Sequence, residues 1–158
     1  MSENPYLQGN YGPVEDETTA LDLPVRGEVP AELDGRLLRI GPNPVEDPGP
    51  DYHWFSGNGL AHGLRLRDGK AEWYRSRYVR DDKVCEVKGW PQTPGPRFSE
   101  ISGGGANTNI IALAGKTYAI VEAGGNPVEL TDELETVARS DFGGTLPGPF
   151  TAHPKICP

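Results

Sequence analysis

The chain contains three histidines, and imidazole is among the commonest protein ligands for iron, zinc and copper. His53 and His62 flank the segment Trp-Phe-Ser-Gly-Asn-Gly (54–59), and His153 lies in Phe-Thr-Ala-His-Pro-Lys (150–155). The simplest interpretation of His53 and His62 is that each fixes a loop by hydrogen bonding. Spacing alone leaves both a structural and a metal-binding role open for His153. The choice between them depends on the secondary-structure elements that surround it.

Two nucleotide-binding motifs are present only in part, because each lacks a glycine that defines it. Gly115-Lys116-Thr117 is similar to the end of a phosphate-binding loop, but Ile110 stands where that motif requires its first glycine. Gly57-Asn58-Gly59 begins a dinucleotide-binding pattern, yet His62 stands where the third glycine would be. The Gly-x-Ser-x-Gly turn of serine hydrolases is also missing. The sequence therefore supports neither a nucleotide site nor a serine nucleophile.

Composition excludes several classes of protein. With 21 glycines and 16 prolines among 158 residues, the chain does not form a helical bundle. Its net charge of −8 disfavours nucleic acid as a partner. It begins without a signal segment and has no apolar run near the roughly 18 residues of a spanning helix, so we expect a cytoplasmic protein without a transmembrane segment. Cys85 and Cys157 fit no metal or disulfide spacing and are expected to be free thiols.

The elements that must position these side chains are predicted to be strands. Residues 1–35 carry scattered prolines and predict an extended lead-in, with one helical turn before Gly35. Asp68-Gly69 predicts a β-hairpin, and Ala114-Gly115 predicts a second one. Strands are expected at residues 36–40, 60–66, 71–80, 109–113, 117–122, 128–130 and 135–138.

The two hairpins form a repeat. A shift of 46 places Asp68-Gly69-Lys70 on Ala114-Gly115-Lys116, and periods of about 40 to 50 residues with several short strands are typical of β-propeller blades. In this register His153 falls 45 residues, about one repeat, after Thr108, at the start of an innermost strand, where side chains of several blades converge. Residues 36–158 are therefore expected to form about two blades of a larger propeller that is incomplete as written.

Five segments carry a resemblance to a known family. They are Gly-Pro-Asn-Pro (41–44), His-Trp-Phe-Ser-Gly-Asn-Gly-Leu-Ala-His-Gly (53–63), Ala-Asn-Thr-Asn (106–109), Val-Glu-Ala-Gly (121–124) and Thr-Ala-His-Pro-Lys (151–155). Together they resemble the carotenoid cleavage oxygenases, iron-dependent enzymes that split carbon–carbon double bonds of polyenes and stilbenes. The resemblance runs from about Asn4 to Lys155. It implies an all-β, seven-bladed propeller of which residues 1–158 would be the N-terminal part.

The resemblance also implies a metal site. In the family an Fe(II) ion is held on the propeller axis by four histidines, and His153 matches the first of them. Glu122 matches a carboxylate that holds a ligand imidazole by its free N–H. His53 and His62 lie in a family motif that binds no metal. Because the other three ligands have no counterpart here, this chain alone is expected not to hold iron. The family usually has Asp two places after the Lys of His-Pro-Lys, where this chain has Cys157.

By this resemblance we expect an O2-dependent enzyme that cleaves carotenoids or apocarotenoids to aldehyde or ketone products. Relatives that cleave phenolic stilbenes tend to carry Lys just before the glutamate, and polyene cleavers an apolar or aromatic residue; here it is Val121. A complete enzyme of this kind would contact membranes to extract its substrate. Two alternatives stay open: a phenolic stilbene dioxygenase, and a propeller fragment without catalytic activity. No substrate-binding residue is assigned.

Overall fold

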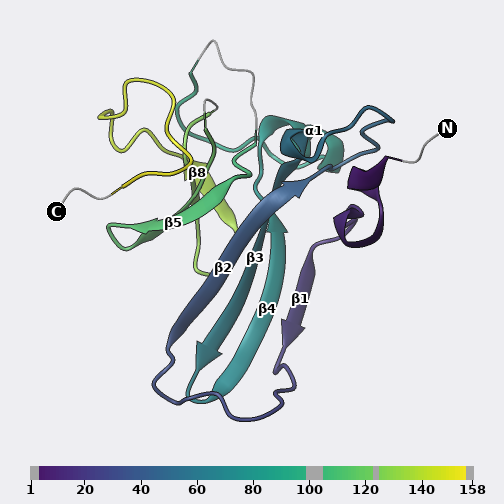
Figure 1. Ribbon diagram of the computed structural model, residues 1–158. Coiled ribbons are helices and arrows are strands. Elements are labelled where there is room, and N and C mark those ends of the chain that lie inside the picture. Colours follow the sequence, from purple (N-terminus) through teal and green to yellow (C-terminus); the bar gives the residue numbers. More distant parts are fainter. Residues whose placement is uncertain (1–3, 99–104, 123–124, 156–158) are drawn as a thin grey trace.

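The computed structural model describes residues 4–98, 105–122 and 125–155, and Figure 1 shows two antiparallel sheets of four strands each. The all-β prediction is confirmed. The first sheet consists of β1 (Thr18–Leu21), β2 (Gly35–Asn43), β3 (Asn58–Arg67) and β4 (Lys70–Tyr78). The second sheet consists of β5 (Asn109–Leu113), β6 (Lys116–Ile120), β7 (Val128–Leu130) and β8 (Thr136–Arg139).

Helical structure is confined to short segments. The described residues contain one α-helix, α1 (Asp82–Lys88), and three 3-10 turns, η1 (Pro5–Leu7), η2 (Gly9–Tyr11) and η3 (Trp54–Ser56). None of these helices is long and apolar enough to cross a bilayer.

Both predicted hairpins are present, with the turns that the sequence indicated. Asp68 and Gly69 join β3 to β4 with φ values of 48° and 71°. Ala114 and Gly115 join β5 to β6 with φ values of 49° and 77°. Two successive residues of positive φ match the right-handed twist of the paired strands, which is why glycine recurs at the second position.

The order and the length of the strands correct the sequence analysis in two places. The first sheet has the order β1-β4-β3-β2, so its outer strand β1 comes from the segment expected to be only an extended lead-in. Because β1 pairs with β4, more than fifty residues later in the chain, no local pattern marked it. β2 also continues through Pro42 instead of ending before Gly41. Proline is tolerated there because β2 is an edge strand.

The two hairpins related by the shift of 46 residues have equivalent turns, but they occupy different positions in their sheets. β3 and β4 are the two central strands of the first sheet, whereas β5 is an edge strand of the second. The predicted strand at 117–122 ends earlier, at Ile120. The helix α1 was not predicted, although it has both of its end signals: the Asp81 side chain accepts the N–H of Val84, and Gly89 adopts a left-handed conformation.

An apolar core lies between the sheets. It joins Ala61 and Val79 of the first sheet region to buried side chains of the second sheet region, namely Ala119, Val128, Leu130 and Leu134. Small residues let the two parts approach closely. A Cβ atom at Gly59 would lie 2.1 Å from the carbonyl oxygen of Ala106, so any larger residue there forces backbone apart.

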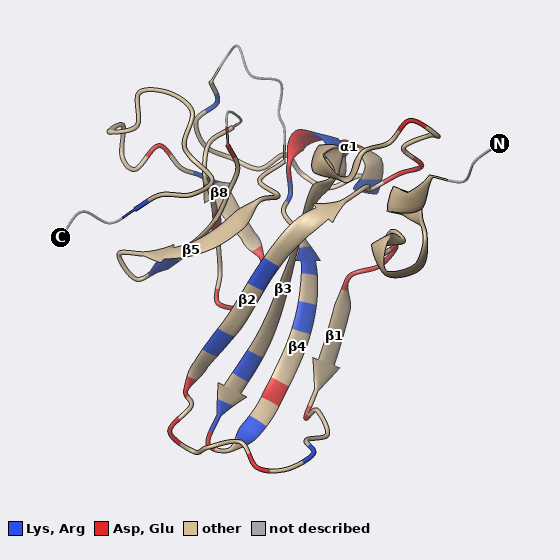
Figure 2. Cartoon of the chain, viewed as in Figure 1, with Lys and Arg blue, Asp and Glu red and all other residues tan. Residues whose placement is uncertain are grey.

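Arginines of the first sheet surround the turn between β7 and β8 (131–135). Figure 2 shows basic residues along β2, β3 and β4. Arg36 lies 3.0 Å from Asp132, and Arg75 lies 2.5 Å from Glu133. Glu135 accepts from Arg77 at 2.7 Å, and Arg80 also reaches it. Side chains of opposite charge thus tie the second sheet to the first at this turn.

Candidate functional site

His153 follows a buried residue and is itself exposed. Ala152 is fully buried, and its carbonyl oxygen accepts a hydrogen bond from Nδ2 of Asn109 at 3.1 Å. The backbone N–H of His153 donates to Oγ1 of Thr151 at 3.2 Å. The His153 side chain is therefore presented to solvent from a backbone segment that is anchored to the start of β5.

Glu122 lies at the same end of the second sheet. β5 begins at Asn109, whose antiparallel partner is Ile120, the last residue of β6. Thr108 extends this pairing by donating its N–H to the Ile120 carbonyl at 3.1 Å. Glu122 follows two residues later and is exposed, while Val121 between them is half-buried. The backbone thus brings the two predicted site residues to one sheet end, next to the start of β5.

The donor set of this sheet end is small. Within residues 4–98, 105–122 and 125–155, no group of three or more His, Cys, Asp or Glu side chains is arranged to hold a metal ion. His153 can offer one imidazole nitrogen, and Glu122 can accept an imidazole N–H. By their chemistry these two residues fit a part of a histidine metal site, and by themselves they do not make a complete one. Of the two cysteines, Cys85 is a buried free thiol in α1, and Cys157 lies outside the described residues.

The other two histidines have structural roles, as the sequence analysis expected. His53 precedes η3, and its Nδ1 accepts the N–H of Phe55 at 3.3 Å. His62 differs from the expectation in one respect, because it lies in the central strand β3 and not in a loop. Its Nδ1 lies 2.7 Å from the Tyr74 hydroxyl. Burial, and secondarily the positive charge of Arg39, lower the pKa of His62 below its usual value.

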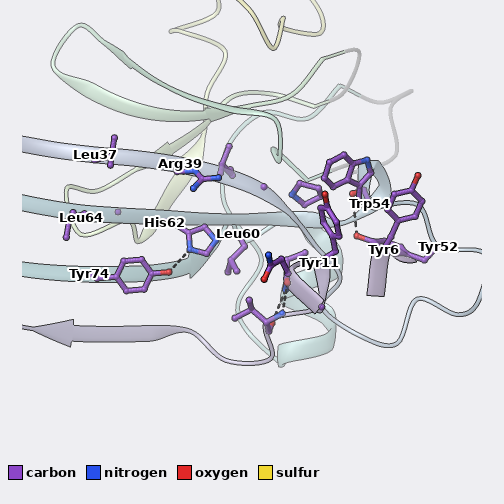
Figure 3. A pocket seen from close by; sticks show the side chains of 18 of the residues that line it. Tyr6, Tyr11, Leu37, Arg39, Tyr52, Trp54, Leu60, His62, Leu64 and Tyr74 are labelled. Carbon is purple, nitrogen blue, oxygen red and sulfur yellow. Dashed lines mark hydrogen bonds between the residues drawn. The ribbon is translucent and has the colours of Figure 1, made fainter. Parts of the chain in front are cut away.

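A hollow of about 820 Å³ covers the face of the first sheet that points away from the second. Figure 3 shows Leu37, Arg39, His62 and Tyr74 along its floor, and the aromatic rings of the N-terminal segment at one end. The sequence analysis did not find this hollow, because its wall is formed by residues that precede β1 and its floor by strands much later in the chain. It contains neither Glu122 nor His153.

Comparison with known proteins gives one consistent result. The family model described as retinal pigment epithelial membrane protein (RPE65) matches residues 11–158. A carotenoid cleavage oxygenase of Mycobacterium tuberculosis is 55% identical over 160 residues, which cover 99% of this chain and 32% of that protein.

Solved structures of similar fold give the same picture. The lignostilbene dioxygenase of Pseudomonas brassicacearum matches with a TM-score of 0.81 at 27% identity, over 98% of this chain and 35% of the other. The cobalt-substituted apocarotenoid oxygenase of Synechocystis matches with a TM-score of 0.75 at 27% identity, over 90% of this chain and 33% of the other. The chain therefore spans about a third of the length of the proteins it matches.

Proposed function

The chain belongs to the carotenoid oxygenase family, and from this premise we propose that it is part of an Fe(II)-dependent dioxygenase that cleaves a carbon–carbon double bond of a carotenoid or apocarotenoid. In the overall reaction the double bond is broken, each of its two carbons receives one oxygen atom of O2, and two carbonyl products form. The observation that carries the proposal is the placement of Glu122 and His153 at one end of the second sheet.

The two residues have different roles in this proposal. His153 supplies one imidazole to the iron, and three further imidazoles come from outside this chain. Glu122 accepts the free N–H of a ligand imidazole, which fixes the tautomer and orientation of that ring. The bound iron supplies the activation of O2, which does not react with a closed-shell polyene at a useful rate by itself. The cobalt-substituted relative supports a metal cofactor.

The substrate class is inferred from Val121, which is half-buried beside Glu122. An apolar side chain gives no cationic partner to a phenolate, so a 4-hydroxystilbene would gain nothing from ionising there. A polyene needs only an apolar channel, because burial of its chain supplies about 25 cal/mol per Å². The similarity to a lignostilbene dioxygenase, at a TM-score of 0.81, makes a phenolic stilbene the second candidate.

The proposal is tested in a hybrid enzyme, in which this chain replaces the matched 160-residue segment of the M. tuberculosis oxygenase. We expect about one iron per hybrid molecule and cleavage of an apocarotenal at a higher kcat/KM than that of a 4-hydroxystilbene. His153→Ala should lose iron and activity. His53→Ala, at an exposed histidine that caps η3 and packs against the rings of Tyr6 and Phe55, is the matched control and should keep both. Full iron occupancy in His153→Ala would refute the ligand assignment, and faster stilbene cleavage would refute the substrate.

A further inference from the structure

The side chain of Asn109 connects two segments that lie more than forty residues apart in the sequence. Its Nδ2 donates to the carbonyl oxygen of Ala152 at 3.1 Å, and its Oδ1 accepts the N–H of Ile110 at 2.8 Å. The amide is therefore held at both ends, which also assigns its oxygen and nitrogen. Asn109 is half-buried at the first position of β5.

This contact fixes the backbone that carries His153. The carbonyl of Ala152 and the N–H of His153 belong to one planar peptide unit. Asn109 binds that unit on its carbonyl side and Thr151 on its N–H side. On the other side of His153, Pro154 restricts the preceding residue to extended backbone angles. With both flanking units restrained, the direction of the His153 Cα–Cβ bond is set, although the side chain itself is exposed.

The same residue is linked to the segment that carries Glu122. Asn109 pairs with Ile120 across the β5–β6 ladder, and Glu122 is two residues beyond that pair. A shift of the Asn109 backbone would therefore move both predicted site residues together. Within the described residues, the bond from Asn109 to Ala152 is the only hydrogen bond that joins the segment around His153 to the ladder.

We propose that Asn109 is a positioning residue for the metal ligand His153, an inference that rests on the proposed iron site. Asn109 does not bind the metal in this proposal. It holds the Ala152–His153 peptide in the orientation that points the imidazole at the iron, and it couples that orientation to the strand end that carries Glu122. Residues that hydrogen-bond a ligand imidazole directly change metal affinity by about 10- to 100-fold when they are replaced, and Asn109, which acts through the backbone, is expected near the lower end of that range.

The test uses the hybrid enzyme and the replacement Asn109→Leu, which keeps the approximate shape of the side chain but removes the donor and adds no charge. We expect iron affinity, measured by competition with a chelator, to fall by about 10-fold or more. We also expect a changed visible spectrum of the Co(II)-substituted protein, because the ligand geometry changes. Asn4→Leu is the matched control, since the half-buried Asn4 likewise accepts a nearby N–H, that of Tyr6 at 2.9 Å, and donates its Nδ2 to a distant carbonyl, that of Tyr52 at 2.7 Å, in the N-terminal segment.

The outcomes separate this inference from the proposed function. If the unmodified hybrid binds no iron, the proposed function fails. If it binds iron and Asn109→Leu binds iron equally well with an unchanged Co(II) spectrum, only the positioning role is refuted. An equal loss of iron affinity in Asn4→Leu also refutes it, because the effect would then follow general stability. If Asn109→Leu does not fold, Asn109→Ser serves instead, since its short hydroxyl does not reach the Ala152 carbonyl.

Discussion

In the first sheet, three strands of nine or ten residues pair along most of their length, whereas the strands of the second sheet have three to five residues. The short ladders of the second sheet make few backbone hydrogen bonds of their own. That sheet nevertheless carries the end at which Glu122 and His153 lie. The comparison indicates that the candidate site is positioned by contacts between the sheets as much as by the sheet on which it is built.

Two kinds of contact hold the second sheet to the first. One is the apolar core, in which Leu134 of the turn between β7 and β8 lies opposite Gly63 of β3. The other is the set of arginine–carboxylate pairs around the same turn, visible in Figure 2 as basic bands on the long strands. Hydrophobic burial is worth more per side chain than a partly exposed ion pair, so the two kinds of contact predict effects of different size.

The largest effect is expected from Leu134→Ala, which removes a side chain that is 0% exposed between the sheets. A cavity in a packed core costs about 2–5 kcal/mol in the free energy of unfolding. Leu113→Ala, at a leucine of β5 that is 38% exposed, is the matched control and should cost only about 0.5 kcal/mol. Urea unfolding of the hybrid enzyme measures both. Equal losses in the free energy of unfolding would show that Leu134 contributes no more than an exposed leucine to the contact between the sheets.

A second prediction concerns the segment that follows the first sheet, where Asp81 is buried at the N-terminal end of α1. Burial raises the pKa of Asp81 above its usual value of 3.8, although hydrogen bonds from Asn58 and from the backbone of α1 oppose that rise. Folding therefore favours the protonated acid, and the Asp81 contribution to stability falls as the pH rises through the interval above 3.8. Asp81→Asn should remove this part of the pH dependence while keeping an acceptor for the N–H of Val84.

Melting temperatures of the hybrid enzyme between about pH 4 and pH 7 check this prediction. Wild type should lose more stability than Asp81→Asn over that interval. Asp47→Asn, at an exposed carboxylate that also accepts a backbone N–H, controls for the loss of one negative charge. Parallel curves for wild type and Asp81→Asn would contradict the assignment of a destabilising buried carboxylate.

The sequence predicted the features that depend on interactions between neighbouring residues, and it missed those that depend on residues far apart in the chain. Both hairpins were found because their turns are local and depend on glycine at a defined position, as at Gly69 and Gly115. The strand β1 was missed because its partner β4 is distant in the sequence. His153 and Glu122 were identified by family resemblance and not by periodicity. Asn109 lies in one of the five segments that carry the resemblance but received no role, since only the folded chain places its amide on the Ala152 carbonyl.

The smallest effect is expected from the ion pairs, and it sharpens the comparison between the sheets. Glu135→Gln weakens the contacts of Glu135 with Arg77 and Arg80, but the Glu135 side chain is 40% exposed, so solvent screens much of their energy. We expect a loss of about 0.5–1 kcal/mol that decreases as salt is added. Arg77 also donates to backbone carbonyls of Thr18 and Ser76, which limits the loss further.

Glu129→Gln is the control within the second sheet, because Glu129 pairs with the exposed Lys116 of the neighbouring strand at 2.7 Å. Arg77 is 12% exposed and the Lys116 side chain 54%, so the pair between the sheets is screened less than the pair within one sheet. Glu135→Gln should therefore destabilise the hybrid enzyme more than Glu129→Gln does, and it should lower iron retention, because it loosens the sheet that carries His153. If Glu129→Gln has the larger effect on both stability and iron retention, contacts within the second sheet position the site, and contacts with the first sheet do not.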